Sequence, residues 1–208
     1  MAQPDPWISC IMLARGRPEL AQRSLHCWLA QTWEARELVI LDDADMRAFG
    51  TPPAHDMIQY HLLPRRLTVG AKRNLACSRA QGEIIAHWDS DDWYAPERLA
   101  DQVKRLIESG RAVTGYHICT FEDLRNGQKW LYNGAICYAL GASLMYRREF
   151  WHRHPFTEEQ VGEDNTMVGR ARGERALVTA DGRDMLIASI HPGNTSPRQI
   201  SGPTWERL

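Results

Sequence analysis

The sequence predicts an α/β protein with a mostly parallel central sheet flanked by helices and a smaller mixed part towards the C-terminus. Over the first 110 residues, apolar runs alternate with segments of helical periodicity, and parallel strands require such crossover connections. After residue 110, shorter apolar runs follow one another across turns such as Asn126–Gly127. No flexible linker separates the two parts, so we expect one domain over residues 1–208 with halves at 1–110 and 111–208.

The first half contains four short apolar runs that predict strands, the third being the weakest. They lie at residues 8–13, 37–41, 57–63 and 83–88. Apolar residues at helical spacing predict three helices, over residues 19–31, 68–80 and 96–109. Pro18 suits the first turn of the first helix, whereas Gly82 and Gly110 lie just beyond the other two, as helix stop signals do. Residues 44–56, rich in Asp, Ala and Pro, are expected to form a loop.

The second half is expected to contain mostly strands. Short apolar runs place them at residues 112–121, 129–132, 142–146, 177–180 and 185–191. One short helix is expected over residues 163–172. From Pro192 onward the chain is rich in Pro, Gly, Asn, Ser and Thr, so we expect an irregular tail.

Composition excludes several classes of protein. The 25 Lys and Arg residues are balanced by 26 Asp and Glu residues, which gives no support to a nucleic-acid-binding surface. No apolar run approaches the ~20 residues of a membrane span, and the N-terminus lacks a signal-peptide pattern, so a cytoplasmic location is expected. The five cysteines are odd in number and form no C-x-x-C pair, which favours buried free thiols over disulfides or a zinc site. Most of the eight tryptophans are expected in the core or half-buried against it.

Acidic residues follow two of the expected parallel strands. Asp42 and Asp43 end the second strand, while Asp89, Asp91 and Asp92 follow the fourth. Ligands of open parallel sheets bind beyond the carboxyl ends of the strands, so both groups should lie at one edge. Close carboxylates repel one another unless a cation or a proton lies between them, and Mg²⁺ or Mn²⁺ suits such oxygens and bridges to phosphates. The alternative is a solvated acidic turn that caps the following helix.

Basic residues near the same edge could bind phosphate. They include Arg15 and Arg17 after the first strand and Lys72 and Arg73 near the start of the second helix. Together with Asn74, Arg73 could bring a guanidinium and an amide to a nucleotide. The alternative for Lys72 and Arg73 is a solvated helix face.

Five segments, in order, carry a resemblance to a known family. They are ISCIMLARGRPEL, ELVILDDAD, VGAKRNLACSRAQGEIIAHWDSDDWYAPERL, GEDN and HPGNT. The chain resembles the family 2 inverting glycosyltransferases, which have the Rossmann-like GT-A fold. The third segment is the most specific, because it joins the nucleotide-contacting helix, a strand and the D-x-D motif.

The resemblance implies a nucleotide-diphosphate sugar as donor, with UDP the expected nucleotide and Mn²⁺ or Mg²⁺ as cofactor. Residues 1–110 would bind the nucleotide, and residues 111–208 would hold the acceptor and the catalytic base. Several positions are expected to contact the base, the ribose or the phosphates: Ala14, Arg15, Arg17, Asp42 or Asp43, Arg73, Asn74 and, on the ribose side, Asp89. Asp91 is expected to bind the metal, with Asp92 in support.

The resemblance also implies the catalytic group. Glu163–Asp164 corresponds to the family's Glu-Asp pair, in which the Asp is the general base, with Glu163 in support. The alternative for Asp164 is an acid stabilised by the dipole at a helix N-terminus. His191 matches a late histidine that binds the metal or a phosphate, and its alternative is a structural histidine. Trp93, like Trp88 and Trp130, is a candidate for the wall of a sugar pocket, although Trp88 is better explained as core.

The chain departs from the commonest family pattern in two ways, which bear on the kind of sugar transfer and on the acceptor. The Q-x-x-R-W motif of processive synthases is absent after Glu163–Asp164, and with the lack of a membrane span this favours transfer of a single sugar. The chain is short for the family, so the acceptor, whether a glycan, a lipid-linked molecule or a small molecule, is poorly constrained. A nucleotidyltransferase and a non-catalytic nucleotide-sugar-binding module are the competing interpretations. The sparse Arg15–Gly16–Arg17 segment disfavours the first, and the intact acids disfavour the second.

Overall fold

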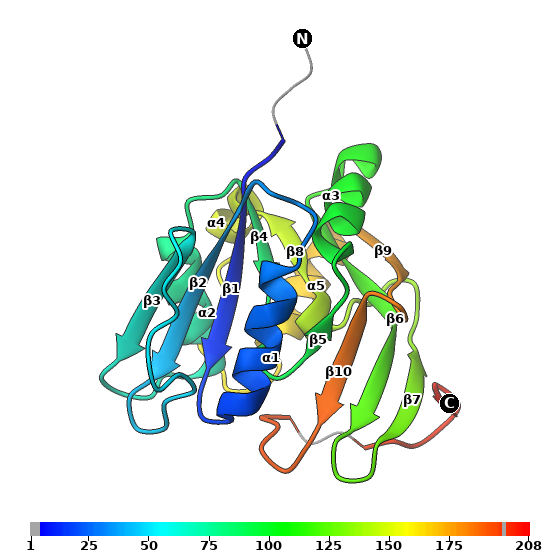
Figure 1. Cartoon of the computed structure of the whole chain (residues 1–208). Helices are drawn as coiled ribbons and strands as arrows, with labels where there is room; N and C mark the ends of the chain where they lie inside the picture. The colour runs from blue at the N-terminus through cyan, green and yellow to red at the C-terminus, as the bar shows by residue number, and fades with distance from the viewer. Residues whose placement is uncertain (1–4, 197–198) are drawn as a thin grey trace.

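The computed structural model describes residues 5–196 and 199–208, whose strands form one mixed sheet (Figure 1). The strands are β1 Ile8–Ala14, β2 Arg36–Asp43, β3 Ile58–Leu63, β4 Ile84–His87, β5 Trp93–Tyr94, β6 Val113–Asp123, β7 Gln128–Asn133, β8 Met145–Arg147, β9 Leu177–Asp181, β10 Leu186–Ile190 and β11 Trp205–Arg207. The helices are α1 Pro18–Leu29, α2 Val69–Arg79, α3 Arg98–Ser109, α4 Arg148–Arg153 and α5 Glu163–Gly173, with a short 3-10 turn at Gly141–Ser143.

The sheet has a parallel core and a mixed flank. Its order is β11-β7-β6-β8-β4-β1-β2-β3, with β9 and β10 also paired to β6. The strands β3, β2, β1 and β4 are parallel to one another. The strand β8 runs antiparallel to both β4 and β6. The predicted mostly parallel sheet with a mixed C-terminal part is therefore confirmed.

Helices cover both faces of this sheet, as the alternating pattern predicted. Helices α1 and α3 lie on one face, where Trp28 and Leu99 pack with Met12 of β1. Helices α2, α4 and α5 lie on the other, where Phe150 and Val168 pack with Ile11. Figure 1 shows α1 in front of β1 and α2 behind the sheet. Because successive side chains of β1 point to opposite faces, this central strand contributes to both cores.

Four elements differ from the sequence prediction. The strand expected at residues 142–146 was wrong in its first part, because Gly141–Ser143 forms a 3-10 turn and the strand begins at Met145. The tail is not wholly irregular, because Trp205–Arg207 pairs antiparallel with β7. The short elements Trp93–Tyr94 and Arg148–Arg153 were not predicted. Each of the four spans at most six residues, which is too short for a periodic signal, and partners far along the chain determine it.

Cysteines and tryptophans lie largely where composition placed them. All five cysteines are free; four are buried and Cys137 is exposed. Trp88 and Trp28 are fully buried in the core. Among the described residues, no helix is both long enough and apolar enough to pass through a membrane.

The ends of α3 and α5 provide a matched test of backbone strain. Gly110 ends α3 in the left-handed conformation with φ +64°, and Arg175 adopts φ +54° just beyond α5. The left-handed region costs about 1–2 kcal/mol for a residue with a Cβ atom. We therefore expect Arg175→Gly to raise the free energy of unfolding by about 0.5–1 kcal/mol, and Gly110→Ala to lower it by about 1 kcal/mol. Urea denaturation measures both changes, and a destabilised Arg175→Gly protein would contradict the prediction.

Candidate active site

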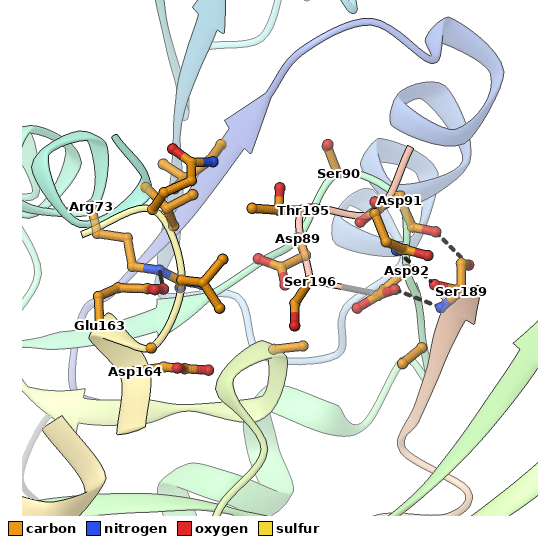
Figure 2. Close-up of a pocket in the computed structure, with 18 of the residues that line it drawn as sticks. Arg73, Asp89, Ser90, Asp91, Asp92, Glu163, Asp164, Ser189, Thr195 and Ser196 are labelled. Carbon is orange, nitrogen blue, oxygen red and sulfur yellow. Dashed lines mark hydrogen bonds and ion pairs between the residues drawn. The ribbon is translucent and has the colours of Figure 1, made fainter. Parts of the chain in front are cut away.

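A cavity of about 210 Å³ opens at the carboxyl edge of the parallel core, beside the start of α5. Half of the predicted site residues line it: Arg17, Arg73, Asp89, Asp91, Asp92, Glu163 and Asp164. Figure 2 shows Arg73, Glu163 and Asp164 on one side, Asp91, Asp92 and Ser189 on the other, and Asp89 between them. The fold therefore brings the acids that follow β4 together with the acids at the start of α5, which lie more than 70 positions later in the chain.

Side chains from distant elements fix the backbone of the acidic loop, residues 89–92. Ser24 Oγ of α1 donates to the Asp89 carbonyl at 2.8 Å. The Asp91 carbonyl accepts hydrogen bonds of 2.6 Å from Arg23 Nη2 and from Ser189 Oγ. The Ser189 amide in turn donates to Asp92 Oδ1 at 2.8 Å. These bonds satisfy loop carbonyls that no strand partner could reach, so the loop is held in one conformation.

Asp91 is the acid that faces both a histidine and an arginine. Its Oδ2 lies 3.0 Å from His191 Nε2 and 3.1 Å from Arg17 Nη1. Burial alone would raise the pKa of Asp91, but the hydrogen bond from His191 and the charge of Arg17 lower it below its ordinary value. The side chain is therefore ionised in the folded protein at neutral pH.

Asp91 and His191 fit a divalent ion that also binds phosphate. Within residues 5–196 and 199–208, no three or more His, Cys, Asp or Glu side chains are grouped to hold a metal by themselves. An ion at this point would have two protein donors, as Mg²⁺ often does when substrate phosphates and water complete its shell. The Asp91 carboxylate and the His191 ring already lie in contact, 3.0 Å apart, so both could reach one ion.

The protonation of His191 makes Asp91 the primary donor of the two. The Gly193 amide donates to His191 Nδ1 at 3.1 Å, which leaves the ring proton on Nε2, where it faces Asp91. To bind an ion through Nε2, the ring would have to carry its proton on Nδ1 instead and give up the hydrogen bond from Gly193. Asp91, which is already ionised, has no such requirement.

The other side of the cavity is organised by a buried ion pair. Arg73 Nε of α2 lies 2.9 Å from Glu163 Oε1 at the start of α5, and both side chains are buried. Burial raises the pKa of Glu163, with the Arg73 charge acting against that shift. Burial alone would lower the pKa of Arg73, but three neighbouring carboxylates, led by Asp89, raise it. Burial likewise raises the pKa of Asp89, with Arg73 acting against the shift.

Asp164 stands next to this ion pair in the first turn of α5. Its Oδ1 accepts a hydrogen bond of 2.8 Å from the Asn165 amide. Its Oδ2 lies against Gly141, where a Cβ atom would be only 1.9 Å away. The carboxylate is partly exposed and faces the cavity (Figure 2), so it can reach a molecule bound there.

A second group of predicted residues lies outside this cavity, at the ends of β1 and β2. Lys72 Nζ contacts Asp43 Oδ1 at 2.9 Å and the Ala14 carbonyl at 2.8 Å. Arg15 lies 3.7 Å from Asp43 and 2.8 Å from Asp45. This group joins the first two strands to α2 and lies at the same edge of the sheet as the acidic loop.

Three predicted residues make contacts within the protein instead of lining the cavity. Asp42 accepts hydrogen bonds from the Ala48 and Phe49 amides and from the Tyr60 hydroxyl, and so anchors the loop after β2. The Asn74 amide is bonded to the backbone of Phe156 through both of its polar atoms. Trp93 lines a separate groove against α1. The predicted contacts of these three with a nucleotide or a sugar remain untested.

Several residues of the site carry no signal in the sequence. Arg23 and Ser24 each hold the acidic loop through one hydrogen bond, Ser189 holds it through two, and Gly141 lies against Asp164. They come from α1, β10 and the 3-10 turn, far from the acids along the chain. A single Ser, Arg or Gly is too common for such a contact to be anticipated without the fold.

The acids at the carboxyl edge of the parallel core, opposed by an acid on a later helix, agree with the family resemblance of the sequence. The sequence model of Glycosyl transferase family 2 matches residues 9–177. Because this match covers most of the chain, the protein belongs to glycosyl transferase family 2.

One curated relative and two solved structures are similar to this chain. "Putative teichuronic acid biosynthesis glycosyltransferase TuaG" of Bacillus subtilis is 28% identical over 130 residues, which cover 57% of this chain and 50% of the relative. S. aureus TarS 1-349 in complex with UDP-GlcNAc superposes with a TM-score of 0.70 at 18% identity, over 91% of this chain and 60% of that one. Mannosyltransferase PcManGT from Pyrobaculum calidifontis, in complex with GDP-Man and Mn²⁺, gives 0.67 at 17% identity, over 91% and 59%. The structural matches establish a GT-A-like fold, and the chain spans about half the length of the curated relative.

The buried ion pair predicts a large asymmetry between single and double substitutions. Removal of one partner of a buried pair costs about 3–5 kcal/mol, whereas replacement of both by apolar residues is often neutral. We expect Glu163→Leu to lower the free energy of unfolding by about 3–5 kcal/mol, and Arg73→Met/Glu163→Leu to recover only part of that loss, because Asp89 and Asp164 lose the same cation. Urea denaturation at neutral pH measures both.

The exposed Lys104–Glu108 pair on α3 is the matched control. Its atoms lie 3.8 Å apart and its side chains are 71% and 65% exposed, so Glu108→Leu should cost less than about 1 kcal/mol. A loss from Glu163→Leu as small as that of the control would show that Arg73 does not depend on Glu163.

Proposed function

We propose that the protein is a metal-dependent, inverting glycosyltransferase that moves one sugar from a nucleotide-diphosphate sugar to an acceptor hydroxyl. The observation that carries the proposal is the placement of Asp91 with His191 at one side of the cavity and Asp164 at the other, with Asp89 between. Family membership supports the reaction class. An inverting displacement requires this arrangement, because the leaving group and the attacking hydroxyl stand on opposite faces of the sugar.

Asp91 and His191 would hold Mn²⁺ or Mg²⁺ together with the diphosphate. The ion, when bound, offsets the negative charge that grows on the departing nucleoside diphosphate. Arg17, which lies against Asp91, would meet the phosphates at the same point, and a guanidinium is well suited to phosphate oxygens. The presence of Mn²⁺ in the PcManGT complex supports a metal in this fold.

The nucleoside would lie along the ends of β1 and β2. Asp43 and Arg15 are the groups there that could meet a base, since Asp42 is taken up by its own loop. Asp89 would face the ribose. In this arrangement residues 1–110 supply the nucleotide contacts, while residues 111–208 supply Asp164 and His191.

Asp164 would act as the general base. Its carboxylate would accept the proton of the acceptor hydroxyl as that oxygen attacks the anomeric carbon, which requires approach to within about 3 Å. Arg73 lies beside Glu163, and Asp164 is one of the carboxylates that raise the pKa of Arg73. UDP is the expected nucleotide, and the TarS and PcManGT complexes hold UDP-GlcNAc and GDP-Man respectively. The acceptor class is a glycan, a lipid-linked molecule or a small molecule that carries a hydroxyl.

Replacement of Asp91 should separate metal binding from folding. We expect Asp91→Asn to weaken Mn²⁺ binding in the presence of UDP by at least tenfold, because the ion loses its only ionised protein donor, while the thermal midpoint stays near that of the parent. Isothermal titration calorimetry with UDP and Mn²⁺ measures the affinity. Asp184→Asn, at an exposed acid away from the cavity, is the control. Unchanged Mn²⁺ affinity in Asp91→Asn would remove the metal assignment.

Replacement of Asp164 should separate binding from transfer. We expect Asp164→Asn to bind UDP and Mn²⁺ as the parent does, yet to lose about 10²–10⁴-fold in the rate of sugar transfer or donor hydrolysis, which is the usual contribution of a general base. Release of UDP measures the rate, and Glu158→Gln, at an exposed acid near α5, is the control. Undiminished turnover would eliminate Asp164 as the base. A parent protein that binds donor but never turns it over would favour a binding module instead.

A further inference from the structure

Three buried side chains hold the 3-10 turn Gly141–Ser143, which we call the floor turn because Ala142 lines the cavity. His87 Nδ1 lies 2.7 Å from the Gly141 carbonyl oxygen. Arg98 Nη2 donates to the Ala142 carbonyl at 3.3 Å, and Gln102 Nε2 donates to the Ser143 carbonyl at 2.7 Å. All three side chains are fully buried. Three consecutive carbonyls are therefore fixed from β4 and α3, on the side away from Asp164.

Arg98 is unusual among these three side chains because it is charged and no acid in the described part of the chain lies within ion-pair distance of it. Among the described residues it forms no ion pair, and its Nη1 has no hydrogen-bond partner. Its guanidinium lies over the rings of Trp88 and Tyr94, 5.1 Å and 4.5 Å from their centres. A buried charge is costly unless other groups compensate for it. The cation–π contacts and the Ala142 carbonyl provide that compensation, so the charge serves to hold this turn.

His87 contacts the carbonyl of Gly141, the residue that lies against Asp164. Burial and the Arg73 charge, which faces the same ring, hold the pKa of His87 well below its ordinary value, so the ring is neutral. Its Nδ1 contacts both the Gly141 carbonyl, which can only accept, and Arg73 Nη1, which can only donate. His87 therefore ties Gly141 to the end of the strand that leads directly into the acidic loop.

The opposite side of Gly141 supports the proposed base. A Cβ atom at this position would lie 1.9 Å from Asp164 Oδ2, 2.8 Å from Cγ and 3.1 Å from Cβ. All of the nearest atoms belong to Asp164, while the Asn165 amide holds the other carboxylate oxygen. Only a residue without a side chain lets the carboxylate lie against the floor turn.

We infer that Gly141 is a positioning residue that sets where the Asp164 carboxylate points, and that His87, Arg98 and Gln102 hold the floor turn in place for it. The role of Asp164 as the base rests on the proposed function. The contact between Gly141 and Asp164 does not depend on it. None of these four residues lines the cavity. They act through the backbone on which the base rests.

A double-mutant cycle on stability tests the contact without any activity. Gly141→Ala should lower the thermal midpoint by roughly 4–8 °C, the usual effect of overpacking in a chain of this size. In an Asp164→Ala background the same change should lower it by less than half as much, because the clashing oxygen is gone. Gly141→Ala that folds only together with Asp164→Ala would support the inference in the same way. An equal loss in both backgrounds would overturn it.

Kinetics and binding test the use of the contact. Gly141→Ala should lower kcat by about 10²-fold with UDP and Mn²⁺ affinity unchanged within twofold, because misplacement of a reacting group by about 1 Å has such an effect. Gln102→Met, which lacks the donor to Ser143 and lies outside the cavity, should lower kcat in the same selective way but less. Gly173→Ala, whose Cβ would meet no atom within 4 Å, is the control with parent activity.

Parent kcat in Gly141→Ala would overturn the inference. A parent protein with no transferase activity would refute the proposed function, and the stability cycle alone would then decide whether the contact exists.

Discussion

The buried guanidinium of Arg73 is the charge on which the cavity depends. Asp89, Glu163 and Asp164 all act on it, and together they raise its pKa despite its burial. Without that cation, carboxylates from two distant parts of the chain would repel one another in a poorly solvated space. Arg73 belongs to α2, which packs between β1 and α5, so a helix from residues 1–110 holds the acids of α5, from residues 111–208, in place. The proposed metal would play the same part at the opposite end, beside Asp91.

The central position of β1 explains why these groups meet. It pairs in parallel with β2 on one side and β4 on the other, so the ends of all three strands reach one edge. The acidic loop follows β4 and the Asp43 group follows β2, which places the proposed phosphate and base contacts side by side. The late strand β10 then returns Ser189 to the acidic loop through its pairing with β6.

The parallel core and the position of the cavity could be predicted from the sequence, because both follow from local patterns of residues. Apolar runs located the parallel strands, and acids at strand ends located the edge that carries the cavity. That Asp42 is bonded to its own loop was beyond prediction, since it depends on whether the Ala48 and Phe49 amides turn back onto it. The floor turn was read as strand for the same reason: its carbonyls are bonded to side chains of β4 and α3, not to a neighbouring strand.

Both ends of the cavity are built in the same way. The acidic loop and the floor turn lack strand partners for key carbonyls, and buried or half-buried side chains from α1, β4 and α3 supply the donors. A carbonyl bound by a packed side chain is held as firmly as the helix or strand that carries that side chain. The separation between Asp91 and Asp164 is therefore set by the packing of the whole sheet, not by two independent loops. A displacement across one sugar ring needs such a fixed separation, because the groups that act on its opposite faces must be in place at the same moment.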